Sequence, residues 1–306
     1  MSDNPHLIIA YAATNDASCQ QALPQLALPQ LQKLLKQRTP APADRGELED
    51  FAPPHERALA RALGLPTQAT PWAALQRLQQ GEAPGEQAWA FITPCHWHIS
   101  PDQVRMSELA AAQMSDAESR QLLEIMAPWF AEDGITLVYE RPDRWLAQGE
   151  VFRGLQTAAL DRIALRDVRP WLPNKEQAAV LQRLQTEMQM LLYTHSWSDA
   201  REAQGQAPIN SFWVHGAGAL PQGYQLPAQQ PLLNTDLRDA ALQGNWPAWQ
   251  QQWQKLDARL AGAAPGTLTL CGEKNAISLQ LQPQGLLQKI KQLLASPQVA
   301  DLLKSL

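Results

Sequence analysis

The stretch PINSFWVHGAG, residues 208–218, decides much of the predicted fold. Its apolar centre SFWV is typical of a short buried strand, and His215, Gly216 and Gly218 predict a polar turn where that strand ends. We expect Asn210 to lock the start of the strand through backbone hydrogen bonds. Because loops at the ends of buried elements often carry function, this stretch is a candidate site as well as a core element. It lacks the third glycine of a dinucleotide fingerprint and the Gly-Lys-Ser/Thr of a P-loop.

Further apolar runs predict strands on either side of a helix. AWAFITP (88–94) and ITLVYE (135–140) have the length of buried strands. Between them, Ser115 and Glu118 form a capping-box pattern that predicts the start of a helix. A strand–helix–strand order is typical of a parallel sheet with crossover helices. LIIAYAA (7–13) predicts another buried strand.

The C-terminal part of the chain contains a tryptophan stripe and a predicted hairpin. Trp246, Trp249 and Trp253 recur at helical spacing, which favours core packing over a cofactor site. TLTLCGEKNAISLQLQP (267–283) alternates apolar and polar residues on both sides of GEKN, as an edge hairpin does. We expect a leucine-rich helix to follow it.

These elements predict an α/β fold with a mostly parallel central sheet, flanking helices and an edge hairpin near the C-terminus. The length of 306 residues is sufficient for one large domain with a substantial core. We therefore expect a single α/β domain over residues 1–306, with a proline-rich loop at about 39–54.

Composition indicates an ordinary globular chain, with 45% hydrophobic and 18% charged residues. A net charge of −5 provides no general attraction for nucleic acid or an anionic membrane, so neither is an expected partner. The three cysteines show no C-x-x-C spacing, which favours reduced thiols. The N-terminal region has no basic segment before its short apolar run, and we expect a cytoplasmic protein.

Two histidines form the one candidate metal site. His96 and His98 stand two residues apart in CHWH, so in an extended segment both rings point to the same side. Paired imidazoles are common ligands of zinc, but nothing nearby in the sequence supplies an obvious third ligand. Hydrogen-bonded histidines at a strand end are the simpler interpretation, and we expect no cofactor.

Basic residues around two loops suggest an anion site. Arg162 belongs to an arginine-rich segment between 141 and 169, and His195 and Arg201 lie in the loop before the SFWV strand. Guanidinium groups bind phosphate or carboxylate through paired donors, so a small anionic ligand is one expectation. Salt bridges to neighbouring aspartates are the structural alternative. Nucleophilic catalysis has little support, because no G-x-S-x-G motif occurs and Cys95 beside His96 has no evident third partner.

One long block resembles a known bacterial family. TEMQMLLYTHSWSDAREAQGQAPINSFWVHGAGALP, together with PCHWHISPDQVRM and RWLAQGEVFRGLQTAALDRIALRDVRPWLP, resembles the RpfE-type regulatory proteins, which are also described as phosphoglycerate-mutase-like. The resemblance covers most of residues 88–221. It implies an alkaline-phosphatase-like α/β fold of the kind found in cofactor-independent phosphoglycerate mutases.

The departures from that pattern matter for activity. Those mutases begin with a strand that ends in a metal-binding Asp-Gly pair, whereas this chain has Ala12 and Ala13 there. Two-metal phosphoryl transfer needs several acidic and histidine ligands. We therefore expect a regulatory or small anionic-ligand-binding protein that lacks this chemistry, with a protein partner as another expectation. The alternatives are an active phosphoglycerate mutase or phosphatase using a divalent metal such as manganese or zinc, and a protein-interaction scaffold.

The expected binding site lies where the loops after residues 94, 194 and 214 meet at strand ends. Its candidate residues come from all three loops and from the arginine-rich segment. They are His96, His98, Arg162, His195, Arg201, Asn210, Trp213, His215, Gly216 and Gly218.

Overall fold

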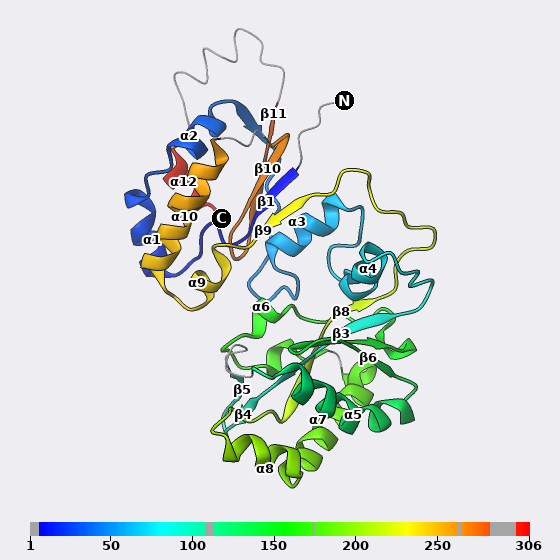
Figure 1. Cartoon of the computed structure of the whole chain (residues 1–306). Coiled ribbons are helices and arrows are strands. Elements are labelled where there is room, and N and C mark those ends of the chain that lie inside the picture. Colours follow the sequence, from blue (N-terminus) through cyan, green and yellow to red (C-terminus); the bar gives the residue numbers. More distant parts are fainter. Residues whose placement is uncertain (1–5, 108–112, 174, 262–264, 282–297) are drawn as a thin grey trace. The chain divides into compact units, whose positions relative to one another are not determined.

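The computed structural model describes residues 6–107, 113–173, 175–261, 265–281 and 298–306 (Figure 1). The chain divides into two compact units. Unit 1 comprises Met1–Thr67 and Leu226–Leu306, and unit 2 comprises Gln68–Gln225. We expected one domain over residues 1–306. The division reflects contacts within the chain and does not test whether both units fold as one domain. The single domain therefore stays a prediction.

Unit 1 is built on a mixed five-stranded sheet in the order β2-β11-β10-β1-β9. Its first segment contains β1 (His6–Ile9), α1 (Ala17–Ala22), η1 (Leu23–Gln25), α2 (Pro29–Leu35), β2 (Arg38–Pro40) and α3 (Pro54–Ala62). Its second segment contains β9 (Leu232–Asn234), α9 (Arg238–Leu242), α10 (Trp246–Leu260), β10 (Thr267–Cys271), β11 (Ala276–Leu281) and α12 (Val299–Lys304). The leucine-rich stretch after β11 falls largely at 282–297, outside the described residues.

The two faces of this sheet are covered by different helices because side chains alternate along a strand. Ile9 of β1 packs in the large cluster formed with α1, α2, α10 and α12, whereas the preceding Ile8 packs with Ala58 of α3. Figure 1 shows the same arrangement, with α3 on one side of the sheet and α10 on the other. Burial on both faces explains why LIIAYAA is a continuous apolar run.

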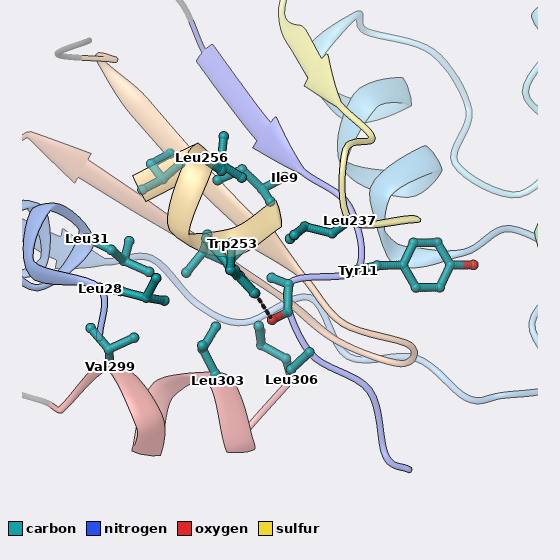
Figure 2. Packing of buried hydrophobic residues seen from close by; sticks show 14 of the residues in the cluster. Ile9, Tyr11, Leu28, Leu31, Leu237, Trp253, Leu256, Val299, Leu303 and Leu306 are labelled. Atoms are coloured by element: carbon teal, nitrogen blue, oxygen red, sulfur yellow. Dashed lines mark hydrogen bonds between the residues drawn. The ribbon is translucent and has the colours of Figure 1, made fainter. Parts of the chain in front are cut away.

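The predicted tryptophan stripe is confirmed as core. Trp249 and Trp253 of α10 are fully buried, and their rings meet edge to face with centroids 6.3 Å apart. Each indole also donates a hydrogen bond to the turn after β1: Trp249 Nε1 to Tyr11 O at 2.9 Å and Trp253 Nε1 to Ala12 O at 3.0 Å. Figure 2 shows the second of these bonds within the cluster. The stripe therefore fixes the backbone where β1 ends.

Unit 2 is built on a four-stranded sheet in the order β6-β7-β3-β8. Its elements begin with α4 (Trp72–Gln79), β3 (Trp89–Cys95), β4 (Trp97–Ile99), β5 (Val104–Met106), α5 (Asp116–Glu132), β6 (Thr136–Arg141) and β7 (Arg144–Gln148). They continue with η3 (Glu150–Phe152), α6 (Leu160–Ile163), η4 (Arg169–Trp171), α7 (Lys175–Tyr193), α8 (Ser196–Ala203) and β8 (Ser211–Gly218). The helices α5 and α7 pack on one face of this sheet. The predicted capping box of Ser115 and Glu118 is present at the start of α5.

The expectation of a mostly parallel sheet is wrong. Among the described strands only β1–β10 and β1–β9 pair in parallel, and every named strand pairing in unit 2 is antiparallel. The strands β3 and β6 do run in the same direction, with β4, β5 and α5 between them in the chain, but β7 lies between them in the sheet. The strand–helix–strand pattern did not predict this order, because β6 is followed by the antiparallel strand β7 and not by another helix. The observed class is mixed α/β.

The predicted C-terminal hairpin is confirmed as β10 and β11, which pair from Thr267↔Gln280 to Cys271↔Ala276. It does not form the edge of the sheet, because β2 adds to β11. The residues of β2 lie at the beginning of the proline-rich segment that we predicted to be a loop at about 39–54. The remainder of that segment reaches α3 without another named strand.

From Ser211 onward, the stretch PINSFWVHGAG forms one strand rather than a strand and a turn. The strand β8 runs through His215, Gly216 and Gly218, and pairs with β3 along its length apart from one irregularity. Gly216 has a φ of +60°, and a Cβ placed on it would lie 2.9 Å from Cβ of Trp72 in α4. The glycine is therefore needed for close packing of α4 on this strand.

Candidate functional site

The candidate residues of β8 lie on the sheet face opposite the α5–α7 core. His215 Nε2 lies 3.1 Å from Thr93 Oγ1, and its ring packs against Phe91 with centroids 5.1 Å apart. Loss of hydration, followed by the positive charge of Arg144, lowers the pKa of His215 to about 3. Trp213 donates its indole N–H to Ala158 O at 2.9 Å. These side chains are held on that face by hydrogen bonds and ring packing.

The hydroxyl of Thr93 and the imidazole of His215 are groups that can act as a nucleophile and a general base. Neither is suited to that role here. A general base works best when its pKa lies near the working pH. An imidazole with a pKa of about 3 is a weak proton acceptor at neutral pH. Thr93 itself is buried. Burial likewise raises the pKa of the Cys95 thiol, which disfavours the thiolate needed for attack.

His96 lies between β3 and β4, and His98 lies in β4 itself. His96 Nδ1 lies 2.9 Å from Ser107 Oγ, and burial, together with the charge of His98, lowers the pKa of His96. His98 lies in β4 with its side chain exposed. Within the described ranges, no three His, Cys, Asp or Glu side chains gather closely enough to bind a metal. His96 thus makes the side-chain hydrogen bond of our simpler interpretation, whereas for His98 that interpretation stays a prediction.

His195 and Arg201 organise the helix α8. His195 is the N-cap, because its Nδ1 accepts a hydrogen bond from Trp197 N at 3.1 Å. Arg201 is buried and donates to Glu118 Oε1 at 3.0 Å and to Ala207 O at 2.8 Å. Its pKa is lowered by burial, which the adjacent carboxylate partly offsets. Arg201 therefore ties α8 to the capping box of α5.

Arg162 lies elsewhere, in the short helix α6, and is buried. The remaining candidate, Asn210, lies just before β8, where its backbone N–H donates to Cys95 O at 3.2 Å and its side chain pairs with the backbone of Trp97. The prediction that Asn210 locks the start of the strand is confirmed. The structure thus distributes the candidates over several places within unit 2.

A cavity in unit 2 lies instead beside the end of α7. We call it the α7–α8 groove; it has a volume of about 550 Å³. Gln189, Met190 and Tyr193 line it from the last turns of α7, and Ser198 and Glu202 line it from α8. Asn210 is the one candidate residue from the sequence that contributes to its wall.

The remaining wall comes from β4 and from the segment that leads into β8. Ile99 at the end of β4 is 58% exposed, and Gln206, Pro208 and Ile209 lie in the segment before β8; Leu192 of α7 also lines the groove. Met190 and Tyr193 are 73% and 87% exposed. A volume of this size is in the range of small-ligand and side-chain pockets. The groove can therefore accept apolar groups.

Sequence reasoning missed this groove, although α7 carried a signal for it. The side of that helix that packs in the core includes Leu184, Met188 and Leu192, all of which are buried. Met190 and Tyr193 are three residues apart and lie on a different face. Large apolar residues on the face away from the core are the feature that could have indicated a binding surface.

Comparisons with known proteins do not assign the chain to a family. No protein-family model and no curated protein sequence matches it. Among solved structures, a cofactor-independent phosphoglycerate mutase from Thermoplasma acidophilum is 12% identical, and the alignment covers 90% of this chain and 89% of that one with a TM-score of 0.36. Likeness at this level says nothing about the site. Across the described residues, no helix has the length and hydropathy to cross a membrane.

Proposed function

We propose that this protein is a non-enzymatic binding protein whose ligand occupies the α7–α8 groove of unit 2. The observation that carries the proposal is the exposure of Met190 and Tyr193 at the edge of a 550 Å³ cavity. Exposed apolar groups around a concavity are typical of binding sites, because their contact with water is unfavourable until a ligand covers them.

The interactions of the polar candidate residues support a binding role over catalysis. His195 and Asn210 hold backbone groups, and Arg201 holds a carboxylate and carbonyl oxygens. A catalytic group has to be directed toward a substrate, with its reactive atom in reach of it. These side chains instead direct their polar atoms into the protein.

The end of β1 does not fit the cation that the phosphoglycerate-mutase resemblance implies. Ala12 and Ala13 are fully buried there and supply no acidic ligand. The carbonyl oxygens of Tyr11 and Ala12 accept the indole N–H groups of α10, so they also have protein partners. Manganese and zinc sites in proteins are built from carboxylate, imidazole or thiolate groups, none of which the two alanines provide.

The groove favours an apolar ligand over the small anion that we expected. Among the described residues that line it, the charged one is Glu202, and none is a lysine or arginine. The guanidinium groups of Arg162 and Arg201 are buried elsewhere in the unit. A carboxylate in the wall repels an anion.

The proposal is tested with Nile red, a neutral dye that fluoresces in apolar sites. We expect saturable binding by the wild-type protein and at least about tenfold weaker binding by Met190→Glu, because a carboxylate in the groove opposes apolar contact. Leu232→Glu is the matched control, since Leu232 is also an exposed apolar residue but belongs to unit 1. Equal binding by all three proteins contradicts the assignment of the groove. Manganese-dependent turnover of p-nitrophenyl phosphate by the pure protein contradicts the non-enzymatic role.

A further inference from the structure

We infer that the occupant of the α7–α8 groove is a basic amphipathic segment of a partner protein. The inference rests on the proposed function and adds the chemistry of the partner. It is carried by the charge of the groove and by hydrogen-bond acceptors in its wall.

The charge of the groove is negative because the acidic residues of α8 are exposed, whereas its basic residue is buried. Asp199 and Glu202 are both exposed and are three residues apart, so they share one side of the helix. Arg201 does not neutralise them, because it is buried against Glu118 on the opposite side. Glu202 therefore places a carboxylate in the lining of the groove, and Asp199 places a second one on the same side of α8.

The end of α7 adds to this negative potential. A helix carries partial negative charge at its C-terminus, where basic side chains usually compensate it. The last turn of α7 contains no basic residue and supplies Gln189, Met190 and Tyr193 to the groove. A cationic group bound here would complement both the helix end and Glu202.

Two polar atoms in the wall of the groove also favour a ligand that carries hydrogen-bond donors. Gln206 and Ser198 line the groove, and Gln206 Oε1 and Ser198 Oγ are buried without a hydrogen-bond partner among the described residues. Buried polar atoms are normally satisfied, and an N–H donor that reached these two closed-off atoms would satisfy both, because Oε1 only accepts and a hydroxyl accepts as well as donates. Lysine and arginine side chains carry several N–H donors and no acceptor.

The apolar part of the groove fits side chains rather than a small polar cation. Met190 is flexible and adapts to differently shaped groups, and the ring of Tyr193 can pack against aliphatic groups or a cation. Amphipathic helices commonly bind by placing their apolar side in such a groove while charged residues pair at its edge. A segment that alternates apolar and basic residues provides both contacts.

Three synthetic 14-residue peptides test the inference by fluorescence anisotropy. All three carry leucines at helical spacing, and their remaining positions are lysine, glutamine or glutamate. We expect the lysine peptide to bind at least about tenfold more tightly than the glutamine peptide, and the glutamate peptide to bind most weakly. Glu202→Gln should weaken binding of the lysine peptide about three- to fivefold and leave the glutamine peptide unchanged.

Glu132→Gln is the matched control, because Glu132 is an exposed glutamate of α5 outside the groove lining. It should bind the lysine peptide as the wild type does. Equal affinity for the lysine and glutamate peptides overturns the inference, as does an unchanged affinity in Glu202→Gln. Self-association of the protein that is lost in Met190→Glu also overturns it, because a second copy would then occupy the groove. If Nile red binding depends on Met190 while the peptides show no charge preference, the proposed function stands and only the partner's chemistry is wrong.

Discussion

The side-chain amide of Asn210 pairs with both backbone groups of Trp97. Asn210 Oδ1 accepts from Trp97 N at 2.8 Å, and Asn210 Nδ2 donates to Trp97 O at 3.0 Å. The side-chain amide thus makes the pair of backbone hydrogen bonds that a neighbouring strand would make. It holds the start of β4 beside the segment that leads into β8. Since Ile99 at the end of β4 lines the α7–α8 groove, this pair also positions one wall of the proposed site.

Asn210→Ala should therefore affect both stability and binding. Loss of two partly buried hydrogen bonds is expected to lower the free energy of unfolding by about 1–3 kcal/mol, measured by urea denaturation. Nile red affinity should fall as well, because β4 is no longer held. Asn210→Asp is the comparison: it keeps the acceptor for Trp97 N but cannot donate to Trp97 O. An alanine variant as stable as the wild type would show that the pair contributes nothing measurable.

The second prediction concerns Gly216 and uses another glycine as its control. Gly216→Ala introduces a Cβ 2.9 Å from Trp72 Cβ and 3.0 Å from Phe91 Cδ2, at a φ of +60°. Gly205 also has a positive φ, +70°, but a Cβ there meets nothing within 4 Å. We expect Gly205→Ala to cost about 1 kcal/mol from backbone strain alone, and Gly216→Ala to cost about 2–4 kcal/mol because it also overpacks the contact with α4. Equal thermal unfolding temperatures for the two variants would refute the packing argument.

The local predictions from sequence succeeded where one element determines the outcome. The capping box of Ser115 and Glu118 depends on residues three apart, and the stripe of Trp249 and Trp253 depends on helical spacing, so both could be recognised in the sequence. The locking role of Asn210 was also predictable, because an asparagine beside a strand commonly bonds to backbone groups.

The sheet order and the groove could not be predicted in the same way. Periodicity shows which side of a strand is buried, but it does not show the strand's neighbour, so the insertion of β7 between β3 and β6 was not apparent. The roles of His195 and Arg201 depend on Trp197 N and on Glu118, which is far away in sequence. Their residue types suggested ligand binding, which stays a prediction; the local contact of His195 with Trp197 N and the long-range contact of Arg201 with Glu118 give both residues a structural role.

The third prediction tests how α10 fixes the turn after β1. Trp253→Phe removes the hydrogen bond from Nε1 to Ala12 O and leaves a space in the core. We expect a loss of about 2–3 kcal/mol in the free energy of unfolding, from the unmade bond and the cavity together. Trp246→Phe is the control, since Trp246 lies on the same helix and is only partly buried. It should cost less than about 1 kcal/mol; a similar loss in both variants would mean that the position on the helix is not decisive.

The fourth prediction is a dependence of stability on pH that arises from His215. Its pKa is lowered from 6.5 to about 3 in the folded protein. Above pH 6.5 the imidazole is neutral in both states and contributes nothing. Between pH 6.5 and about 3 the unfolded chain binds a proton that the folded protein does not, so acid favours unfolding.

This window gives a measurable difference between variants. The slope for one proton is about 1.4 kcal/mol per pH unit, so His215 should account for about 1–2 kcal/mol of the stability lost between pH 7 and pH 5. His215→Gln keeps a polar group near Thr93 but cannot titrate, so its loss over that interval should be smaller by this amount. Urea unfolding of both proteins at pH 7, 6 and 5 measures the difference. Parallel curves for the two proteins would place the pKa of His215 near its ordinary value, and the description of its ring as poorly hydrated would then be wrong.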